Sequence, residues 1–483
     1  MKNFYVNTII IALLSIFAAV NLSAKEFRFK EDKSIFRNPG QGWLCFAPAM
    51  RPIEDSHVNY GAGYERFEWK DIQPEENKFD WERIDRCLRN FQKAGYPFYF
   101  RIMCANYHSK GRYCTPEWVF KKGAKGIEFG ALKTDVNYIA DPDNPAWKQK
   151  RVAPIFDDEI WLAEHEKFIK AMAERYDGHP ALGGIDLGSY GNWGEWHVEM
   201  LPLEEATLAT RKRIADMYLK HFKKTTILSL TQDAEILEYN IGDGEGSRVG
   251  MRRDGIGSKK YMDNWETSKK YGHIKKLPEI WKYKPIVFEW INNYRMLKHW
   301  TDFKFSVDWM IENHVNLIND GPLRPWLVDR SEHLEQIRRL DKFAGARLVL
   351  RSANVDVEDG LLKINIIGVN KGAGRIILPY EIVYDVIESP EAVENRVRTE
   401  KQSHYKIGEE RVLATFKSTT DPRKILPGGI DIKDSFKLSL PAGKYKLRLT
   451  IKSTFGGYRN FRPAVMEADN YTGELMLGCF EVK

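Results

Sequence analysis

The chain has 483 residues, 43% of them hydrophobic and 29% charged, which excludes a wholly disordered, fibrous or polytopic membrane protein. At about 100–200 residues per domain, the length predicts two or three domains, or one large barrel with a smaller companion. The formal net charge is +7, but the 74 basic and 67 acidic residues are interspersed, which argues against a nucleic-acid-binding face.

The first 24 residues have the pattern of a secretory signal peptide. Lys2 precedes an apolar run from Ile9 to Val20, and the small residues Ser23 and Ala24 follow. The run is shorter than the roughly 20 residues that a membrane-spanning helix needs. An uncleaved anchor is the alternative. We expect residues 25–483 to be secreted or periplasmic, with no membrane span after signal cleavage.

From residue 25 to residue 344, short apolar runs alternate with helical patterns. Helices are predicted over 81–91, 160–176 and 203–222, the first of them stopped by Gly95. Eight strands over about 300 residues predict a (β/α)8 TIM barrel. An open doubly wound sheet is the alternative, which the lack of a glycine-rich loop after the first strand disfavours. The predicted strands are 42–46, 64–69, 97–103, 184–189, 226–230, 248–252, 286–290 and 315–318.

Residues 345–483 change to a pattern with period 2. The segments 363–366 and 444–452 alternate apolar and polar residues, and turn signals such as Asp359-Gly360 separate them. This pattern predicts an antiparallel β-sandwich. All 14 tryptophans precede Ala344, so we interpret the sandwich as a support for the barrel rather than a carbohydrate-binding module with an indole platform.

The five cysteines are too few and too scattered for a disulfide framework. The sequence does not decide whether Cys104 and Cys114 form a disulfide. No cysteine or histidine spacing indicates a structural zinc, and His108, His197 and Asp233 lack the spacing of a helical zinc site. We therefore predict no metal and no cofactor.

Two glutamates follow predicted strands in unusual surroundings. Glu195 lies in the segment Tyr190-Gly-Asn-Trp-Gly-Glu-Trp-His197, between two glycines and two tryptophans. Apolar indoles raise the pKa of a nearby carboxyl and favour an acid that is protonated near neutral pH. Glu289 comes directly after the apolar run 285–288, where a charge is costly unless it serves a site. The alternative for each glutamate is a salt bridge at the barrel rim.

Two segments carry a resemblance to known families. Trp69, Pro74 and the helix start Phe79-Asp80-Trp81, within residues 67–81, resemble the second βα unit of β-galactosidase-like members of the clan A glycoside hydrolases. Asp80 is expected to cap that helix. Asn38-Pro-Gly-Gln-Gly42 together with the segment 194–197 resembles uncharacterised secreted glycosidase-like proteins that have a C-terminal β-domain of unknown function.

The resemblance implies a retaining β-glycosidase that acts by double displacement on an oligo- or polysaccharide. Glu195 would be the acid/base after strand four, and Glu289 the nucleophile after strand seven. The two carboxyls then lie about 5–5.5 Å apart, whereas about 6.5–9.5 Å would mean inversion. The sequence departs from clan A at Gly194, where these enzymes place an asparagine, and Asn192 lies two residues earlier.

Other residues at predicted strand ends are candidates for substrate binding. Arg101 could orient a carboxylate, either Glu289 or an acidic sugar. The alternatives are a rim salt bridge for Arg101, a loop cap for Asp233 and core packing for the tryptophans. A barrel that binds a glycan without cleaving it is the alternative function, and the oligomeric state is open. The substrate-binding candidates are Trp43, Arg101, Asn192, Trp193, His197, Asp233, Asp254 and Trp290.

Overall fold

The computed structural model describes most of the chain after the predicted signal peptide, which lies outside the described residues. No helix among the described residues has the length and apolar character needed to cross a bilayer. The described residues are 25–46, 58, 60–133, 135, 141–143, 145–291, 303–321, 323, 325, 328, 331–388, 411–454 and 457–483.

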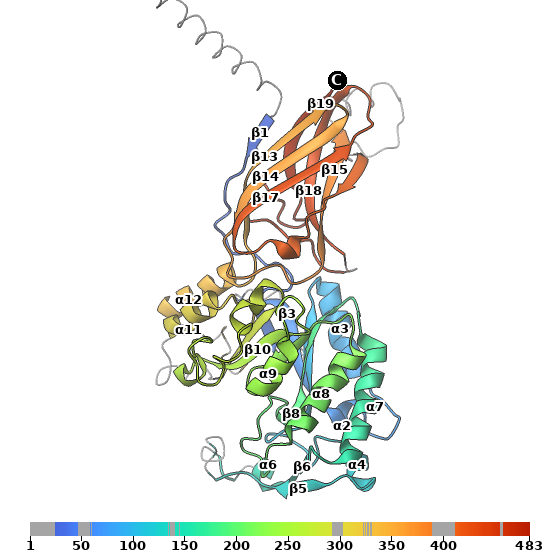
Figure 1. The fold of residues 1–483 in the computed structure, drawn as a ribbon, viewed down its shortest axis with the longest axis vertical. Coiled ribbons are helices and arrows are strands. Elements are labelled where there is room, and N and C mark those ends of the chain that lie inside the picture. Colours follow the sequence, from blue (N-terminus) through green and yellow to red (C-terminus); the bar gives the residue numbers. More distant parts are fainter. Residues whose placement is uncertain are drawn as a thin grey trace, which may run out of the picture.

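Eight parallel strands close into a barrel, which confirms the predicted (β/α)8 fold (Figure 1). Each strand pairs with the next along the chain, and the last pairs with the first. A short ninth strand, β8 (Ser189–Asn192), pairs with β4 beyond the end of β7. The barrel strands are β2 (Gly42–Phe46), β3 (Tyr60–Glu68), β4 (Phe98–Ala105), β7 (Leu182–Asp186), β9 (Ile227–Leu230), β10 (Gly250–Ile256), β11 (Ile286–Trp290) and β12 (Leu317–Asn319).

The strands are apolar runs because both of their faces are covered. Every residue of β4 and of β11 is buried. One face packs against the surrounding helices, while a second set of apolar side chains forms a cluster contributed by strands all around the barrel. That interior cluster comprises Leu44, Ala62, Tyr64, Tyr99, Leu228, Val287 and Leu317.

Most of the helices lie between the strands, as predicted. The longer ones are α3 (Glu82–Ala94), α7 (Glu159–Tyr176), α8 (Leu208–His221), α9 (Ala234–Ile241), α11 (Phe303–Glu312) and α12 (Ser331–Phe343). Shorter elements are α2 (Trp69–Ile72), α4 (Glu117–Lys121), α6 (Pro145–Lys148), η3 (Lys259–Tyr261), η4 (Leu277–Lys282) and the hairpin β5 (Gly126–Phe129)–β6 (Arg151–Pro154).

Two predicted helix starts are wrong, while one stop is right. Gly95 ends α3 with a φ of 83°, as expected of a C-terminal glycine. Asp80 does not cap α3, because its N-cap residue is Trp81 and no side chain accepts a bond there. Helix α8 begins at Leu208 rather than near residue 203, since the Thr207 side chain accepts from the Thr210 N–H.

The C-terminal residues form two four-stranded antiparallel sheets around a common apolar core, which confirms a separate β-domain. One sheet has the order β1 (Lys25–Arg28), β13 (Leu348–Glu358), β14 (Leu361–Asn370), β17 (Gly428–Lys437). The other has the order β16 (Val412–Lys417), β15 (Tyr380–Glu388), β18 (Gly443–Ser453), β19 (Leu475–Val482). The short 3-10 helix η6 (Pro422–Lys424) lies between β16 and β17.

The predicted start of the barrel at residue 25 needs a correction. Strand β1 pairs antiparallel with β13, with Lys25 opposite Val355, so residues 25–28 belong to the sandwich. Residues 25–28 therefore lie in the sandwich, and the chain enters the barrel before Gly42 and returns to the sandwich after α12.

The sandwich packs against the end of the barrel from which the strands start (Figure 1). The Arg459 N–H donates to the carbonyl of Gly95, which precedes β4, at 3.1 Å. His314, which precedes β12, bonds the carbonyl of Ala373 through Nδ1 at 2.8 Å. The carboxyl ends of the strands, where barrel enzymes place their chemistry, lie at the other end.

All five cysteines are free thiols. The Cys114 thiol donates to the carbonyl of Met103 at 3.2 Å, and the Cys104 sulfur lies 3.8 Å from His165 Nδ1. The two thiols thus have separate partners.

Candidate active site

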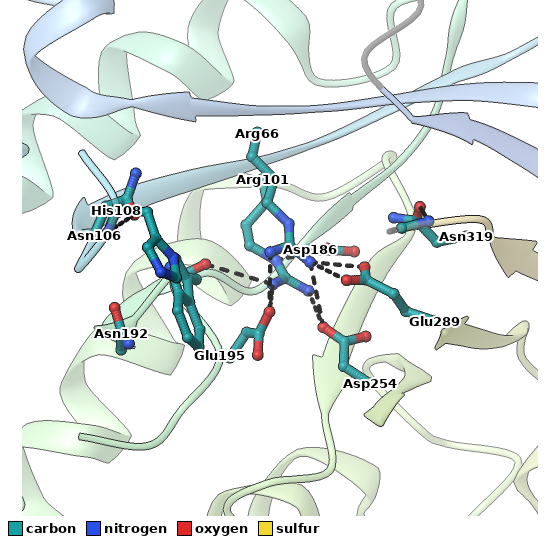
Figure 2. A network of polar contacts seen from close by, with 12 residues as sticks. Arg66, Arg101, Asn106, His108, Asp186, Asn192, Glu195, Asp254, Glu289 and Asn319 are labelled. Atoms are coloured by element: carbon teal, nitrogen blue, oxygen red, sulfur yellow. Dashed lines mark hydrogen bonds and ion pairs between the residues drawn. The ribbon is translucent and has the colours of Figure 1, made fainter. Parts of the chain in front are cut away.

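A network of three arginines and four carboxylates fills the carboxyl end of the barrel. Figure 2 shows Arg66 and Arg101 with the four carboxylates. Strand register sorts the charges: Arg66 on β3 is opposite Arg101 on β4, and Asp254 on β10 is opposite Glu289 on β11. The arginines of β3 and β4 are thus neighbours, as are the carboxylates of β10 and β11, and these side chains meet within the barrel together with Arg252 of β10. Network members are Arg66, Arg101, Arg252, Asp186, Glu195, Asp254 and Glu289.

A tightly folded loop after β8 carries Glu195 to this network. Trp193, Gly194 and Trp196 have φ angles of 55°, 69° and 61°, so the chain reverses within a few residues. A Cβ at Gly194 would lie 3.0 Å from the carbonyl oxygen of Ile102, closer than real Cβ contacts allow without movement. The close approach to β4 therefore explains why glycine stands where clan A enzymes have asparagine.

Glu289 extends from the seventh barrel strand and is held by two guanidinium groups. Arg66 Nη2 lies 2.6 and 2.7 Å from its two carboxylate oxygens. Arg252 Nη2 contacts the same carboxylate. Gly321 packs beside it, where a Cβ would lie 3.2 Å from Glu289 Cγ. These contacts hold the Glu289 carboxylate in place.

Arg66 joins the two predicted catalytic glutamates. Its Nη1 lies 3.0 Å from Glu195 Oε1, while its Nη2 binds Glu289 and lies 3.7 Å from Asp254 Oδ2. One oxygen each of Glu195, Asp254 and Glu289 lies within 4.8 Å of the others. The glutamates that the sequence places after strands four and seven are therefore neighbours in the fold.

Burial and charge act in opposite directions on the two strand carboxylates. Burial raises the pKa of Glu289 to about 7; Arg66 opposes this rise and the Asp254 charge adds to it. The pKa of Asp254 is lowered, because Arg252, Arg101 and Arg66 together outweigh its burial. Asp254 is therefore the permanently charged member of this pair, and Glu289 the one that titrates near neutral pH.

Several predicted residues do lie in or beside the network. Arg101 is fully buried and contacts Asp186 at 2.8 Å, Glu195 at 3.2 Å and Asp254 at 3.0 Å. It therefore orients the predicted acid/base and not Glu289. His197 Nε2 lies 3.5 Å from Glu195 Oε2. Trp193 is half-buried at the same edge and stacks on His108, with ring centroids 5.4 Å apart.

Asn192 and Asp233 do not join the network. The Asn192 side-chain oxygen accepts from the Tyr107 N–H at 3.0 Å, and its side-chain NH2 donates to the carbonyl of Glu199 at 3.2 Å. The Asn192 side chain therefore holds the loop. Asp233 accepts from the Ile236 N–H at the start of α9 and pairs with Arg211. It has the capping role that was the alternative.

Trp43 and Trp290 are both fully buried, so neither indole presents a face to solvent. Trp290 stacks on Phe303 of α11, with centroids 4.9 Å apart. Core packing accounts for both, and the predicted stacking on a sugar finds no support. The reason is strand alternation: Trp290 follows Glu289 and points to the opposite face.

Sequence reasoning missed three residues of the network: Arg66, Arg252 and Asp186. Tyr64 and Arg66 share one face of β3, and Arg252 and Asp254 share one face of β10, because side chains alternate along a strand. The signal in the sequence was a charged residue inside an apolar run, as at Arg66, or two of them two positions apart, as at Arg252 and Asp254. Asp186, at the end of β7, accepts the Tyr64 hydroxyl at 2.6 Å and is fully buried.

The carboxylates of Glu195, Asp254 and Glu289 also have the mutual spacing of a metal-ligand set. Arg66 already supplies a cation to all three, at 2.6–3.7 Å. The donor set thus fits a guanidinium as it stands, and a divalent ion would have to displace it.

Comparison with known proteins finds glycoside hydrolases. Residues 48–189 match the family model of the glycoside hydrolase family 42 β-galactosidases. Endo-glycoceramidase II from Rhodococcus sp. has 12% identity and a TM-score of 0.42, over 86% of this chain and 100% of that one. A β-galactosidase from Halorubrum lacusprofundi has 10% identity and a TM-score of 0.34, over 63% of this chain and 58% of that one.

One curated relative is cobyrinate a,c-diamide synthase of Listeria innocua, 24% identical over 145 residues, or 29% of this chain. The chain spans about a third of that relative, 32% of its length.

The closed barrel with carboxylates at the carboxyl ends of its strands defines the class of the protein, a (β/α)8 barrel, and the matched segment agrees with the resemblance to clan A glycoside hydrolases that the sequence indicated. Within that class, residues 48–189 are similar to β-galactosidases.

Proposed function

We propose that the protein is a retaining β-glycosidase acting on an oligo- or polysaccharide, exported by its signal peptide to the periplasm or the medium. The observation that carries the proposal is that one carboxylate oxygen of Glu195 and one of Glu289 lie within 4.8 Å of each other. Glu195 comes from the loop after β8, and Glu289 from β11, the seventh barrel strand. This separation suits direct attack by one carboxylate, because an inverting enzyme needs room for a water between them.

In the first step, Glu289 attacks the anomeric carbon while Glu195 donates its proton to the leaving glycosidic oxygen. The C–O bond to the leaving group breaks and a glycosyl ester with Glu289 forms. In the second step, Glu195 takes a proton from water, whose oxygen attacks the anomeric carbon and releases Glu289 as a carboxylate.

Arg66 and Arg101 have distinct roles in this scheme. Arg101 fixes the orientation of Glu195 through Nη1, and it is itself held by two buried aspartates. Arg66 favours the ionised form of Glu289, which is the form that attacks. Because its guanidinium bridges both glutamates, it has to give up its bond to Glu195 when a sugar enters between them.

That bridge is also the observation that favours the second candidate, a glycan-binding barrel without activity. A guanidinium that stays between the two carboxylates would keep the anomeric carbon from reaching Glu289. The two functions differ in whether product is released.

The test is a panel of aryl β-glycosides and polysaccharides with residues 25–483, beside Glu195→Gln and Glu289→Gln. Removing a nucleophile or a general acid costs on the order of 10²–10⁴-fold, so both variants are expected to lose at least about 10²-fold in kcat. Tyr471→Ala, at a residue that is 89% exposed on the sandwich, is the control and keeps the carboxylates. Activity that survives either glutamine would overturn the assignment, and binding without turnover would establish the second candidate.

A further inference from the structure

We propose that the barrel has a second carbohydrate-binding site on its flank, for one sugar ring of a neutral glycan. The site is a cavity of about 220 Å3 between η4, the loop after β10 and the residues that precede β12. The proposal rests on the function proposed above only in taking a glycan as the ligand. The lining residues that carry the argument are Asn264, Trp265, Glu266, Trp281, Glu312 and His314.

The cavity lies at the other end of the barrel from the carboxylate network. Met251 and Ile286, which also line it, stand near the starts of β10 and β11, whereas Asp254 and Glu289 stand toward the ends of these strands. A ligand here could not reach Glu289. The site is therefore suited to holding a chain, not to cleaving it.

Trp281, which is half-buried, gives the cavity an apolar wall of fixed geometry, and the buried Trp265 packs at its base. Trp281 stacks on His314 with ring centroids 3.5 Å apart and planes 18° apart, and His314 is tied to the carbonyl of Ala373 in the sandwich. Trp265 is wedged against Trp309 and Tyr271, at 5.4 and 5.2 Å. Rigid aromatic surfaces of this kind bind the C–H face of a sugar with little loss of side-chain entropy.

The polar groups of the cavity offer both acceptors and a donor. Among the described residues, the carboxylates of Glu266 and Glu312 make no ion pair or hydrogen bond. The Asn264 carbonyl accepts from the N–H groups of Glu266 and Thr267, which turns its amide NH2 outward as a donor without a partner in the described part of the chain.

This combination selects hydroxyl groups over charged ligands. A hydroxyl both donates and accepts, so it can use the two carboxylates and the amide at once. Two unpaired carboxylates repel a uronic acid or a sulfated sugar. An ammonium group would use the carboxylates and the indole and leave the exposed amide to water, whereas a sugar ring with several hydroxyls uses all three groups. The cavity is smaller than the roughly 300 Å3 of a typical small-molecule site, which fits a single ring of a longer chain.

The test uses residues 25–483 carrying Glu195→Gln, so that glycan is bound but not consumed. Migration is measured in native gels that contain soluble β-1,4-galactan, xylan or mixed-linkage β-glucan at increasing concentration. We expect retardation in at least one gel, with an apparent Kd raised about tenfold by Trp281→Ala, the upper range for one stacking contact. Tyr471→Ala removes an aromatic ring that is 89% exposed on the sandwich and is the matched control with unchanged migration.

Glu312→Gln tests the site without removing a packed ring, because Glu312 is exposed and has no partner among the described residues. It is expected to weaken retardation about threefold. In protein that keeps Glu195, it is expected to leave the turnover of a small aryl glycoside unchanged. Absence of retardation in all three gels, or retardation equal to the parent in both Trp281→Ala and Glu312→Gln, would overturn the proposal. If the protein that keeps Glu195 turns over no glycoside, while retardation is present and is weakened by Trp281→Ala, the result counts against the proposed catalytic function alone.

Discussion

At the scale of single residues, the chemistry depends on Arg66. Its guanidinium contacts Glu195, Glu289 and Asp254, and it supports the charge that burial disfavours on Glu289. Removing one partner of a buried ion pair is strongly unfavourable, because the remaining charge stays buried without a counter-charge.

Arg66→Met is accordingly expected to raise the pKa of Glu289 and to lower kcat by about 10²-fold at pH 7, because fewer molecules have an ionised nucleophile. Rates measured up to pH 9 are expected to recover part of the loss. Arg66→Lys keeps the charge and should lie between wild type and Arg66→Met. A uniform loss at every pH would mean that Arg66 acts by shape and not through the charge of Glu289.

The pH dependence follows from the same carboxyl. Glu289 attacks only when it is ionised, and its pKa is raised to about 7. The value of kcat/KM, which reports the free enzyme, should therefore fall as pH drops below about 7, by roughly tenfold per unit. A profile measured with an aryl glycoside from pH 4 to pH 9 checks this. A plateau that extends down to pH 5 would contradict the role given to Glu289.

At the scale of elements, the loop 190–197 shows why local sequence rules did not predict the whole site. Its two tryptophans with positive φ and its glycine against β4 make a turn whose shape comes from contacts with Ile102 and Leu187. The local composition located Glu195, while propensity alone gave no reason for these backbone angles.

Gly194→Ala is expected to destabilise the protein by about 1–3 kcal/mol and to reduce activity, because alanine at φ 69° is strained and its Cβ would meet the Ile102 carbonyl at 3.0 Å. Thermal unfolding and aryl glycoside turnover measure the two effects. Gly360→Ala, in the turn between β13 and β14, is the matched control, since it has φ 73° and a Cβ there would have nothing within 4 Å. Equal effects of both substitutions would mean that the close approach to β4 is unimportant.

At the scale of the whole molecule, the segment 38–42 joins the two domains and does not build the site. The Asn38 amide donates to the carbonyl of Arg462 at 3.0 Å, and its oxygen accepts from the Arg462 N–H at 2.8 Å. Gln41 accepts from the Ala346 N–H at 3.1 Å. A segment noted for a resemblance to secreted glycosidase-like proteins thus has a structural role here.

Asn38→Ala removes both bonds to Arg462 and leaves buried backbone groups without partners, at a cost of about 1–3 kcal/mol. The melting temperature is expected to fall, while kcat on an aryl glycoside below that temperature stays near that of wild type. Asn365→Ala, on β14 of the sandwich, is the control outside the junction. A melting temperature equal to that of the control would contradict the junction.

The sequence predicted the barrel and the second domain because apolar runs and their period report burial directly. It singled out Glu195 and Glu289 from their surroundings at predicted strand ends, and the family resemblance supplied their roles. The capping of α3, the start of α8 and the pairing of β1 depend on hydrogen bonds and on contacts between distant segments, which no local pattern specifies. Arg66 has its role through Glu195 and Glu289, which lie more than 100 residues away along the chain, so its own position on β3 did not reveal that role.

The central claim is that Glu289 forms a covalent bond with the sugar. The most direct measurement is to incubate the protein with an activated 2-deoxy-2-fluoro β-glycoside of the sugar it turns over best, and to locate the adduct by peptide mass spectrometry. The account predicts one glycosyl group per chain, on Glu289, and none on the Glu289→Gln variant. An adduct on Glu195 or Asp254, or turnover that never yields an adduct and inverts the anomeric centre, would contradict it.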